Sequence, residues 1–138
     1  RRHYGAIIVR NDEIIATGYN GAPRGRINCD ELGYCVREQL AIPSGERYEL
    51  CRSVHAEANA IIHASRADMI GGTLYLVGVD AHTGDLVSDA NPCAMCKRLI
   101  INAGISRVVI RNTSDSFTAA YVQEWIEQDG SLNGECGY

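Results

Sequence analysis

The sequence predicts a single-domain α/β fold in which a mixed β-sheet packs against helices. Two observations lead to this prediction. Short apolar runs typical of strands alternate along the chain with amphipathic helical patterns, and such alternation is typical of a sheet covered by helices. The length of 138 residues also suits one domain with one hydrophobic core. We therefore treat residues 1–138 as a single domain.

The first half contains two expected strands and one expected helix. Residues 4–9 and 13–19 are isoleucine-rich runs, and the short polar connection between them predicts an antiparallel hairpin. Ser53 is a good helix N-cap, and apolar residues follow it at helical spacing through Ala64. We therefore expect a helix that starts near Ser53.

The second half alternates strands with helices. Residues 73–79 and 107–111 predict strands, and residues 92–104 predict a helix that starts at a proline and stops at a glycine. Residues 118–128 predict a last amphipathic helix. Because helical crossovers join parallel strands, we expect the later strands of the sheet to run parallel.

Residues 21–52 match no regular element. A stretch of this length without secondary structure is uncommon inside a compact domain unless something holds it. It contains three of the six cysteines of the chain, Cys29, Cys35 and Cys51. We therefore regard residues 21–52 as a cysteine-containing insertion.

Composition narrows the class of protein. A net charge of −4 is opposite to the basic excess of proteins that coat nucleic acids, so we expect no nucleic-acid partner. No apolar run reaches the length of a membrane span, and the opening residues do not resemble a secretory signal. We expect a cytoplasmic protein whose cysteines serve a metal or catalysis. Because the sequence begins at Arg1 and soon enters an apolar run, we also expect a native segment before it.

Two short motifs carry metal-ligand chemistry. A His-x-Glu motif, with His55 and Glu57, lies at one predicted helix start, and a Pro-Cys-x-x-Cys motif, with Cys93 and Cys96, lies at another. The two cysteines are three residues apart, so their thiols face the same side of the first turn, where the helix dipole favours thiolates. One imidazole and two thiolates supply three ligands of a tetrahedral Zn²⁺ and leave the fourth position open, as in a catalytic site.

Together the two motifs resemble the signature of zinc-dependent nucleobase deaminases. Longer segments resemble the dCMP deaminase family of that superfamily, namely residues 4–9, the Gly-Tyr-Asn-Gly-Ala-Pro-Arg-Gly run at 18–25, and residues 54–61 and 92–105. The resemblance implies the cytidine deaminase-like three-layer α/β/α sandwich. It also implies hydrolysis of dCMP to dUMP and ammonia, which supplies dUMP for thymidylate synthesis.

The resemblance also implies roles for individual residues. His55, Cys93 and Cys96 would bind zinc, and Glu57 would move the protons of the reaction. The implied substrate-binding residues are Asn20 for the sugar or ring, Arg24 and Arg26 for the 5′-phosphate, and Ser88 and Ala90 near the leaving amine. The structural alternatives are a turn residue for Asn20 and a solvated loop arginine for Arg24.

Several members of the family carry a second, structural zinc close to this insertion. Its implied ligands here are Cys29, Cys35 and Cys51, and a metal held by them would order the loop. Structural zinc takes four ligands, so the fourth would be His3, Cys136 or a residue before Arg1. The alternative is three ordinary buried thiols. Family members are commonly activated by dCTP, inhibited by dTTP and hexameric, so we expect these effectors and a homo-oligomer, either a dimer or a hexamer.

Other functions fit less well. tRNA adenosine deaminases usually have a glutamate before the Pro-Cys pair and a basic surface, whereas this chain has Asn91 and a net charge of −4. Free cytidine deaminases lack the Gly-Ala-Pro-Arg-Gly loop, and the deaminase of riboflavin synthesis spaces its two cysteines more widely. A non-catalytic zinc-stabilised interaction domain would not need Glu57 beside the metal.

Overall fold

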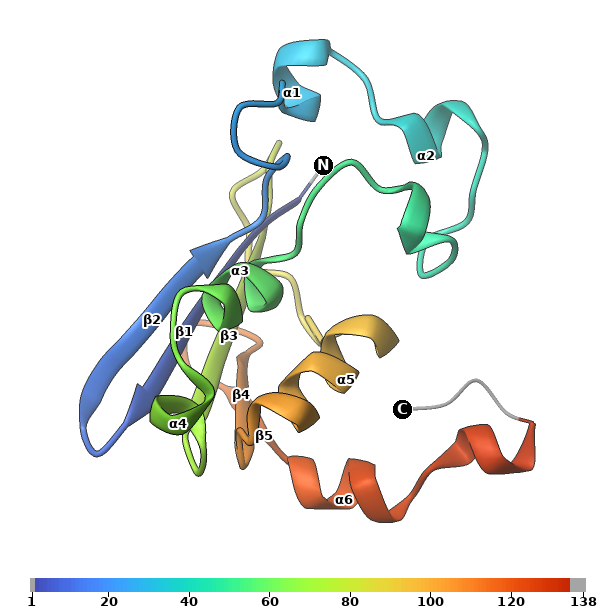
Figure 1. Cartoon of the computed structure of the whole chain (residues 1–138). Coiled ribbons are helices and arrows are strands. Elements are labelled where there is room, and N and C mark those ends of the chain that lie inside the picture. Colours follow the sequence, from blue (N-terminus) through green and yellow to red (C-terminus); the bar gives the residue numbers. More distant parts are fainter. Residues whose placement is uncertain (1, 135–138) are drawn as a thin grey trace.

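Figure 1 shows the computed structural model of the chain, which describes residues 2–134. A five-stranded mixed sheet with the strand order β2-β1-β3-β4-β5 forms its centre. The strands are β1 (Arg2–Arg10), β2 (Glu13–Tyr19), β3 (Thr73–Asp80), β4 (Arg107–Arg111) and β5 (Phe117–Tyr121). The helices are α1 (Cys29–Leu32), α2 (Val36–Gln39), α3 (Ala56–Ile62), α4 (Arg66–Met69), α5 (Ala94–Ala103) and α6 (Val122–Glu127), with short 3-10 helices η1 (Tyr48–Leu50) and η2 (Gly130–Asn133).

The first two strands form the predicted hairpin. β1 and β2 pair antiparallel, and the turn residues Asn11 and Asp12 have φ values of 52° and 61°. Two consecutive residues in the left-handed region match the type of two-residue turn that suits the twist of a hairpin. β3 pairs antiparallel with β1 and parallel with β4, so the prediction of a parallel crossover is confirmed for β3 and β4.

The prediction for the end of the sheet was wrong. The expected helix at 118–128 is divided, because residues Phe117–Tyr121 form β5 and only Val122–Glu127 are helical. β5 pairs antiparallel with β4, so the later strands are not all parallel. The connecting residues Asn112 to Ser116 make a tight turn, in which the amide nitrogen of Asn112 donates to the carbonyl oxygen of Ser116. Asn, Asp and Ser residues of this kind are favoured in turns, and here they reverse the chain so that β4 and β5 form a hairpin.

Helices α3, α4, α5 and α6 all lie on one side of the sheet (Figure 1). Their apolar residues share one core with the strand residues that point the same way, such as Ile8, Leu74 and Val108. On the other side, Ile7 and Tyr75 are 38% and 40% exposed. The mixed-sheet α/β sandwich is therefore confirmed, and within residues 2–134 the helical layer of α3, α4, α5 and α6 covers the Ile8 side of the sheet.

The insertion lies beyond one end of the sheet, at the top of Figure 1, and contains α1, α2 and η1. Arg37 is the single fully buried residue between positions 21 and 52. This segment therefore has no apolar core of its own. No helix within residues 2–134 combines the length and the apolar character needed to cross a bilayer.

Candidate active site

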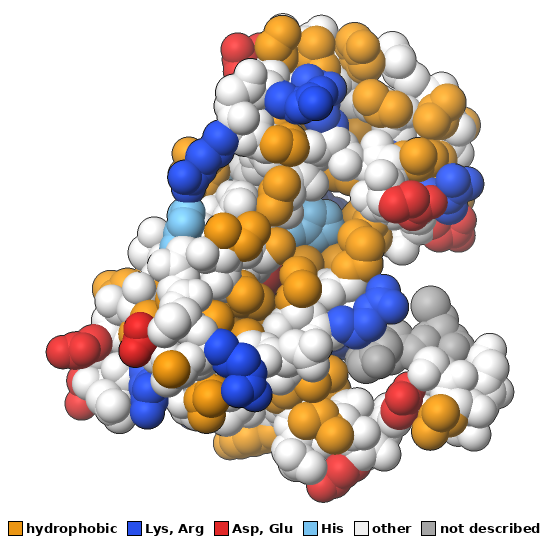
Figure 2. All heavy atoms as spheres, viewed as in Figure 1, with side chains coloured by type: hydrophobic (Ala, Val, Ile, Leu, Met, Phe, Trp, Pro, Cys, Tyr) orange, Lys and Arg blue, Asp and Glu red, His pale blue; other side chains and the backbone are white. Residues whose placement is uncertain are grey.

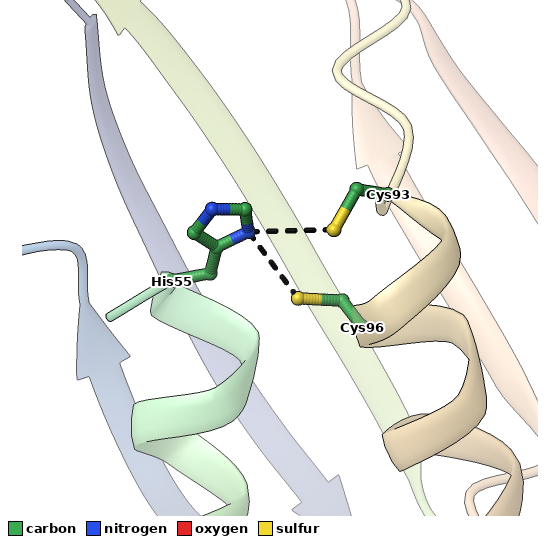
Figure 3. Close-up of side chains that lie close together, drawn as sticks. All are labelled: His55, Cys93 and Cys96. Atoms are coloured by element: carbon green, nitrogen blue, oxygen red, sulfur yellow. Dashed lines mark hydrogen bonds between the residues drawn. The ribbon is translucent and has the colours of Figure 1, made fainter. Parts of the chain in front are cut away.

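Three metal-ligand side chains meet where α3 and α5 begin (Figure 3). The Nδ1 atom of His55 lies 3.5 Å from the Sγ atom of Cys93 and 3.4 Å from that of Cys96. A tetrahedral zinc ion, with bonds of about 2.05 Å to nitrogen and about 2.3 Å to sulfur, would hold these atoms about 3.5 Å apart. The donor set and its spacing therefore fit zinc. Within residues 2–134 no other group of three or more His, Cys, Asp or Glu side chains is arranged in this way.

The two helix starts explain why these ligands meet. His55 is the N-cap residue of α3, and Cys93 is the N-cap residue of α5, each with extended backbone angles. Cys96 lies in the first turn of α5 and is 2% exposed. Both thiols are thus held where the positive end of the α5 dipole favours the thiolate that a metal needs.

The helix that follows His55 starts later than the sequence predicts. Ser53 is not its N-cap, because α3 begins one residue after His55. Val54 instead forms an isolated antiparallel bridge with Gly21, with N···O distances of 3.1 Å and 2.7 Å. This bridge keeps the chain extended up to His55, and it also brings the loop after β2 next to the metal ligand.

α3 packs directly against the backbone of β2 at Gly18. A Cβ atom at Gly18 would lie 2.4 Å from the carbonyl oxygen of Ala56 and 2.4 Å from the nitrogen of Ala60. The side-chain Nδ2 of Asn59 donates to the carbonyl oxygen of the last residue of β2, at 2.7 Å. The strand therefore determines where α3 lies, and α3 determines where Glu57 lies.

Glu57 lies in the first turn of α3 and is 5% exposed. Burial raises the pKa of its carboxyl group, because the charged form loses its hydration. The Cys96 thiol also donates a hydrogen bond to this carboxyl group, so Glu57 faces the metal ligands. A buried carboxyl group with a raised pKa beside a metal site is suited to taking up and releasing protons.

Hydrogen bonds among the metal-ligand side chains shift their pKa values. Hydrogen bonds with the side chains of Cys51 and Cys93 raise the pKa of His55 to about 10. The hydrogen bond between the Cys93 and Cys96 side chains lowers the pKa of Cys93 to about 4, with further help from His55. The same hydrogen bond, together with burial, raises the pKa of Cys96. Zinc binding would displace the protons held by His55 and Cys96.

The three insertion cysteines are half-buried free thiols. Burial raises the pKa of Cys29, and the next causes are the nearby Cys35 and Cys51. Their Sγ atoms nevertheless do not all lie within 4.8 Å of one another. The strongest influence on Cys51 is its hydrogen bond with His55, which lowers the pKa of the Cys51 thiol. Of the predicted fourth ligands, Cys136 lies outside the described residues.

Asn20 directly precedes Gly21, which pairs with Val54 next to the metal ligand His55. Its Oδ1 accepts from the amide nitrogen of Tyr4 at 2.8 Å, and its Nδ2 donates to the carbonyl oxygen of Arg2 at 3.1 Å. The side chain therefore ties this loop to the first residues of β1. Because a primary amide has two donor hydrogens and two acceptor lone pairs, one of each is left for a ligand.

Arg24 lies at the far end of α3 from the metal ligands. Its Nη2 is 2.5 Å from the Nε2 atom of His63, the C-cap residue of α3, and the Nδ1 atom of His63 donates to the carbonyl oxygen of Thr17 at 2.7 Å. Because an arginine side chain can only donate, Nε2 of His63 accepts the hydrogen bond from Arg24. With a rise of about 1.5 Å per residue, His63 is about 12 Å along the helix axis from His55.

The remaining predicted substrate residues are Arg26, Ser88 and Ala90. Arg26 and Ser88 are exposed, and Ala90 is buried. The amide nitrogen of Arg26 closes a turn onto the carbonyl oxygen of Pro23 at 2.9 Å.

An aromatic ring that no sequence motif singles out contacts the metal ligand His55. Tyr48 packs edge-on against His55, with ring centroids 5.2 Å apart and an interplanar angle of 88°. A single aromatic residue in an irregular insertion has no periodic or spacing signal, so only the folded chain shows this contact.

Comparison with known proteins agrees with this site. Residues 1–112 match the model of the cytidine and deoxycytidylate deaminase zinc-binding region. A deoxycytidylate deaminase of Schizosaccharomyces pombe is 37% identical over 125 residues, which are 89% of this chain and 35% of that protein. A deoxycytidylate deaminase of Mycobacterium phage D29 is 38% identical over 114 residues, which are 79% of this chain and 77% of that protein. The chain thus spans little more than a third of the fission-yeast relative and most of the phage relative.

Two solved structures of deaminases also resemble this chain. The dCMP deaminase of cyanophage S-TIM5, in complex with dCMP and dUMP, matches with a TM-score of 0.50 and 28% identity over 80% of this chain and 65% of that one. A cytidine deaminase from Burkholderia pseudomallei matches with a TM-score of 0.54 and 18% identity over 90% of this chain and 78% of that one, which shows the shared fold. By its family match, its relatives and its zinc-ligand group, the chain belongs to the cytidine and deoxycytidylate deaminase family of zinc-binding proteins.

Proposed function

We propose that this chain hydrolyses dCMP to dUMP and ammonia. The observation that carries the proposal is the buried Glu57 beside the ligand group of His55, Cys93 and Cys96. Three protein ligands are typical of a catalytic zinc site with one open position. The choice of dCMP is supported by the relatives named deoxycytidylate deaminase and by the S-TIM5 enzyme, whose structure contains dCMP and dUMP.

In the proposed reaction, Glu57 moves the protons and bound zinc would activate the attacking water. Bound zinc would act as a Lewis acid and lower the pKa of a water molecule. Glu57 would accept a proton from the attacking water and return it to the ring nitrogen N3 as oxygen adds to C4. It would then take the remaining proton from the new hydroxyl group on C4 and pass it to the amine, so that the C4–N bond breaks, the C4 carbonyl forms and ammonia leaves. Its raised pKa suits a group that must both take and give protons.

The substrate contacts form a second part of the proposal. Asn20 is placed by the Gly21 bridge beside the residue that precedes His55, which supports a contact with the sugar or the ring. Arg24 and Arg26 are the exposed cations of the same loop, which supports a role in binding the 5′-phosphate. Backbone groups near Ser88 and Ala90 would lie around the leaving amine.

A structural zinc in the insertion is a third part of the proposal. It is supported by three free, half-buried thiols in one short segment, close enough for Cys35 and Cys51 to influence the pKa of Cys29. Metal analysis of purified protein tests it. Two zinc ions per chain, falling to one in Cys35→Ser, would support the second site, whereas one zinc per chain in both proteins would contradict it.

Ammonia release from dCMP tests the activity, with deoxycytidine, CMP and dCTP in parallel and with protein of known zinc content. Selective turnover of dCMP is the expected result. Glu57→Gln keeps the shape of the side chain but cannot carry the proton, so it should retain zinc and lose about 10²- to 10⁴-fold in kcat. A zinc-loaded wild type that turns over none of these substrates would overturn the proposal. Unchanged turnover in Glu57→Gln would instead refute the role of Glu57.

Regulation and assembly are the least supported part. The nucleotide effectors dCTP and dTTP, and a dimer or hexamer of this chain, follow from the family resemblance alone. Sedimentation of the protein with and without dCTP, together with dCMP turnover in the presence of dCTP or dTTP, tests both. A monomer whose turnover neither nucleotide changes would contradict this part and leave the catalytic proposal untouched.

A further inference from the structure

The insertion is organised around a buried charge. Arg37 is 6% exposed, and the other buried charged side chain within residues 2–134 is the catalytic candidate Glu57. A guanidinium group away from water is unfavourable unless its donors are paired. Here Nε and Nη2 of Arg37 donate to the carbonyl oxygen of Glu46 at 3.1 Å and 2.7 Å, and Nη2 also donates to that of Pro43 at 3.1 Å. These bonds fix the loop that precedes η1.

The same guanidinium group holds an aromatic ring. Its central carbon lies 4.5 Å from the ring centroid of Tyr48, which is a cation–π contact. Tyr48 is the first residue of η1 and is half-buried. Its ring in turn contacts the ring of His55 edge-on, at 5.2 Å between centroids. A continuous set of contacts thus runs from Arg37 through Tyr48 to a metal ligand. Figure 2 shows the molecular surface hollowed below the insertion, with histidine atoms visible inside.

A metal-binding histidine depends on what holds the rest of its ring. Groups that hold the ring outside the metal bond fix its orientation, and the loss of a hydrogen-bonded partner of this kind typically weakens metal affinity or activity about 10- to 100-fold. His55 is only the N-cap of α3, so the helix itself does not fix its ring plane. The edge of Tyr48 does so on one side, and the hydrogen bond with Cys51 adds a second restraint from the same insertion.

We propose that Tyr48 is a positioning residue for the zinc ligand His55, and that Arg37 holds Tyr48 in place. The insertion then acts directly on the catalytic site, and its organisation becomes a determinant of metal binding. This proposal rests on the zinc site of the proposed function. It does not depend on which nucleotide the enzyme deaminates.

Cobalt substitution provides the decisive measurement, because the visible absorption bands of tetrahedral Co²⁺ report ligand geometry without any turnover. Tyr48→Leu removes the aromatic edge and keeps an apolar side chain. Its cobalt spectrum should change, and its zinc affinity by chelator competition should fall about 10- to 100-fold. Tyr48→Phe retains the ring and should match the wild type in both measurements. Tyr34→Leu, which replaces an exposed tyrosine of the same insertion, is the matched control and should also match.

A second variant keeps the proposal testable if Tyr48→Leu does not fold. Arg37→Lys retains the charge but loses the planar fork that stacks on the ring. It should change the cobalt spectrum in the same direction and weaken zinc binding by less than Tyr48→Leu does. A purely structural role would lower the melting temperature and leave both metal measurements unchanged in Tyr48→Leu and Arg37→Lys, which would overturn the proposal.

Activity data then separate this proposal from the function itself. With dCMP as substrate, Tyr48→Leu should lower kcat more than it raises KM. A wild type that binds Co²⁺ normally but does not deaminate dCMP would refute the proposed substrate, while the cobalt spectra of the variants would still decide the role of Tyr48.

Discussion

Replacing Gly18 with alanine would insert a methyl group between β2 and α3, the helix that carries Glu57. The added Cβ would lie 2.4 Å from two backbone atoms of α3, whereas ordinary contacts of this kind begin near 3.4 Å. Neither obstacle is a flexible side chain, since one is the carbonyl oxygen of Ala56 and the other is the nitrogen of Ala60. The strand and the helix must therefore separate by about 1 Å.

A separation of about 1 Å is large compared with the variation in metal–ligand distance that a zinc site tolerates. Ligand distances in zinc sites vary by only about 0.2 Å, and Cys93 and Cys96 on α5 would not move together with His55. Overpacking of this kind costs about 1–3 kcal/mol of unfolding free energy. For a domain of this size the melting temperature should fall by about 3–12 °C. Zinc affinity should fall at least about 10-fold.

Thermal unfolding of the zinc-loaded protein and chelator competition measure the two effects. Gly5→Ala is the matched control, because Gly5 lies in the neighbouring strand and a Cβ there would meet only Cγ1 of Val77, at an ordinary 3.7 Å. Its unfolding free energy should change by less than about 1 kcal/mol. A Gly18→Ala protein with the melting temperature and zinc affinity of the wild type would refute the claim that β2 determines where α3 lies.

Three further predictions concern the same site. Chelation of zinc should lower the melting temperature, since a metal bound only to the folded state at 1,000 times its dissociation constant stabilises that state by about 4 kcal/mol; equal melting curves with and without zinc would contradict the site. Zinc affinity should rise about 10-fold or more for each pH unit between about pH 6 and pH 9, because zinc must displace protons from His55 and Cys96. The pKa of His55 is about 10, and the pKa of Cys96 is raised above its usual value, so both side chains hold their protons in this pH range. An affinity that does not depend on pH in a competition titration would count against this reasoning. Asn59→Ala, which removes the 2.7 Å hydrogen bond from α3 to the end of β2, should cost about 0.5–1.5 kcal/mol in chemical denaturation, and an unchanged midpoint would show that the bond is dispensable.

The fold assembles the site from two helix starts that are far apart in sequence. His55 follows the chain that returns from the insertion, and Cys93 follows the loop after β3. α3 and α5 lie on the same side of the sheet, so their N-terminal residues face each other at one end of it (Figure 3). The site therefore needs the packing of both helices on the sheet, although each motif is local.

Local chemistry explains what was predictable from the sequence. The hairpin of β1 and β2 follows from a period of apolar residues and a polar turn, and the β3-α5-β4 unit follows from alternation of strand and helix patterns. Cys93 and Cys96 were recognisable as zinc ligands because a spacing of three places two thiols on one side of a helix turn. In each case the signal lies within a few consecutive residues.

Distant contacts decided the rest, and the sequence pattern carries little trace of them. The 117–121 segment is a strand because it pairs with β4, although its residues also suit an amphipathic helix. α3 starts after His55 because Val54 pairs with Gly21, more than thirty positions earlier, and not because of a local cap. His63 binds Arg24, and Tyr48 contacts His55, only because the folded chain brings their segments together.

The sequence by itself therefore determined the chemistry of this protein, namely one imidazole, two thiolates and a carboxylate at recognisable spacings. Only the tertiary structure decided how closely these groups approach one another and how their pKa values shift. It also decided which side chains of the insertion contact the metal ligand His55. The physical reason is that ligand identity is a property of single residues and short spacings, whereas distances, burial and pKa values arise from packing between segments that are remote in the chain.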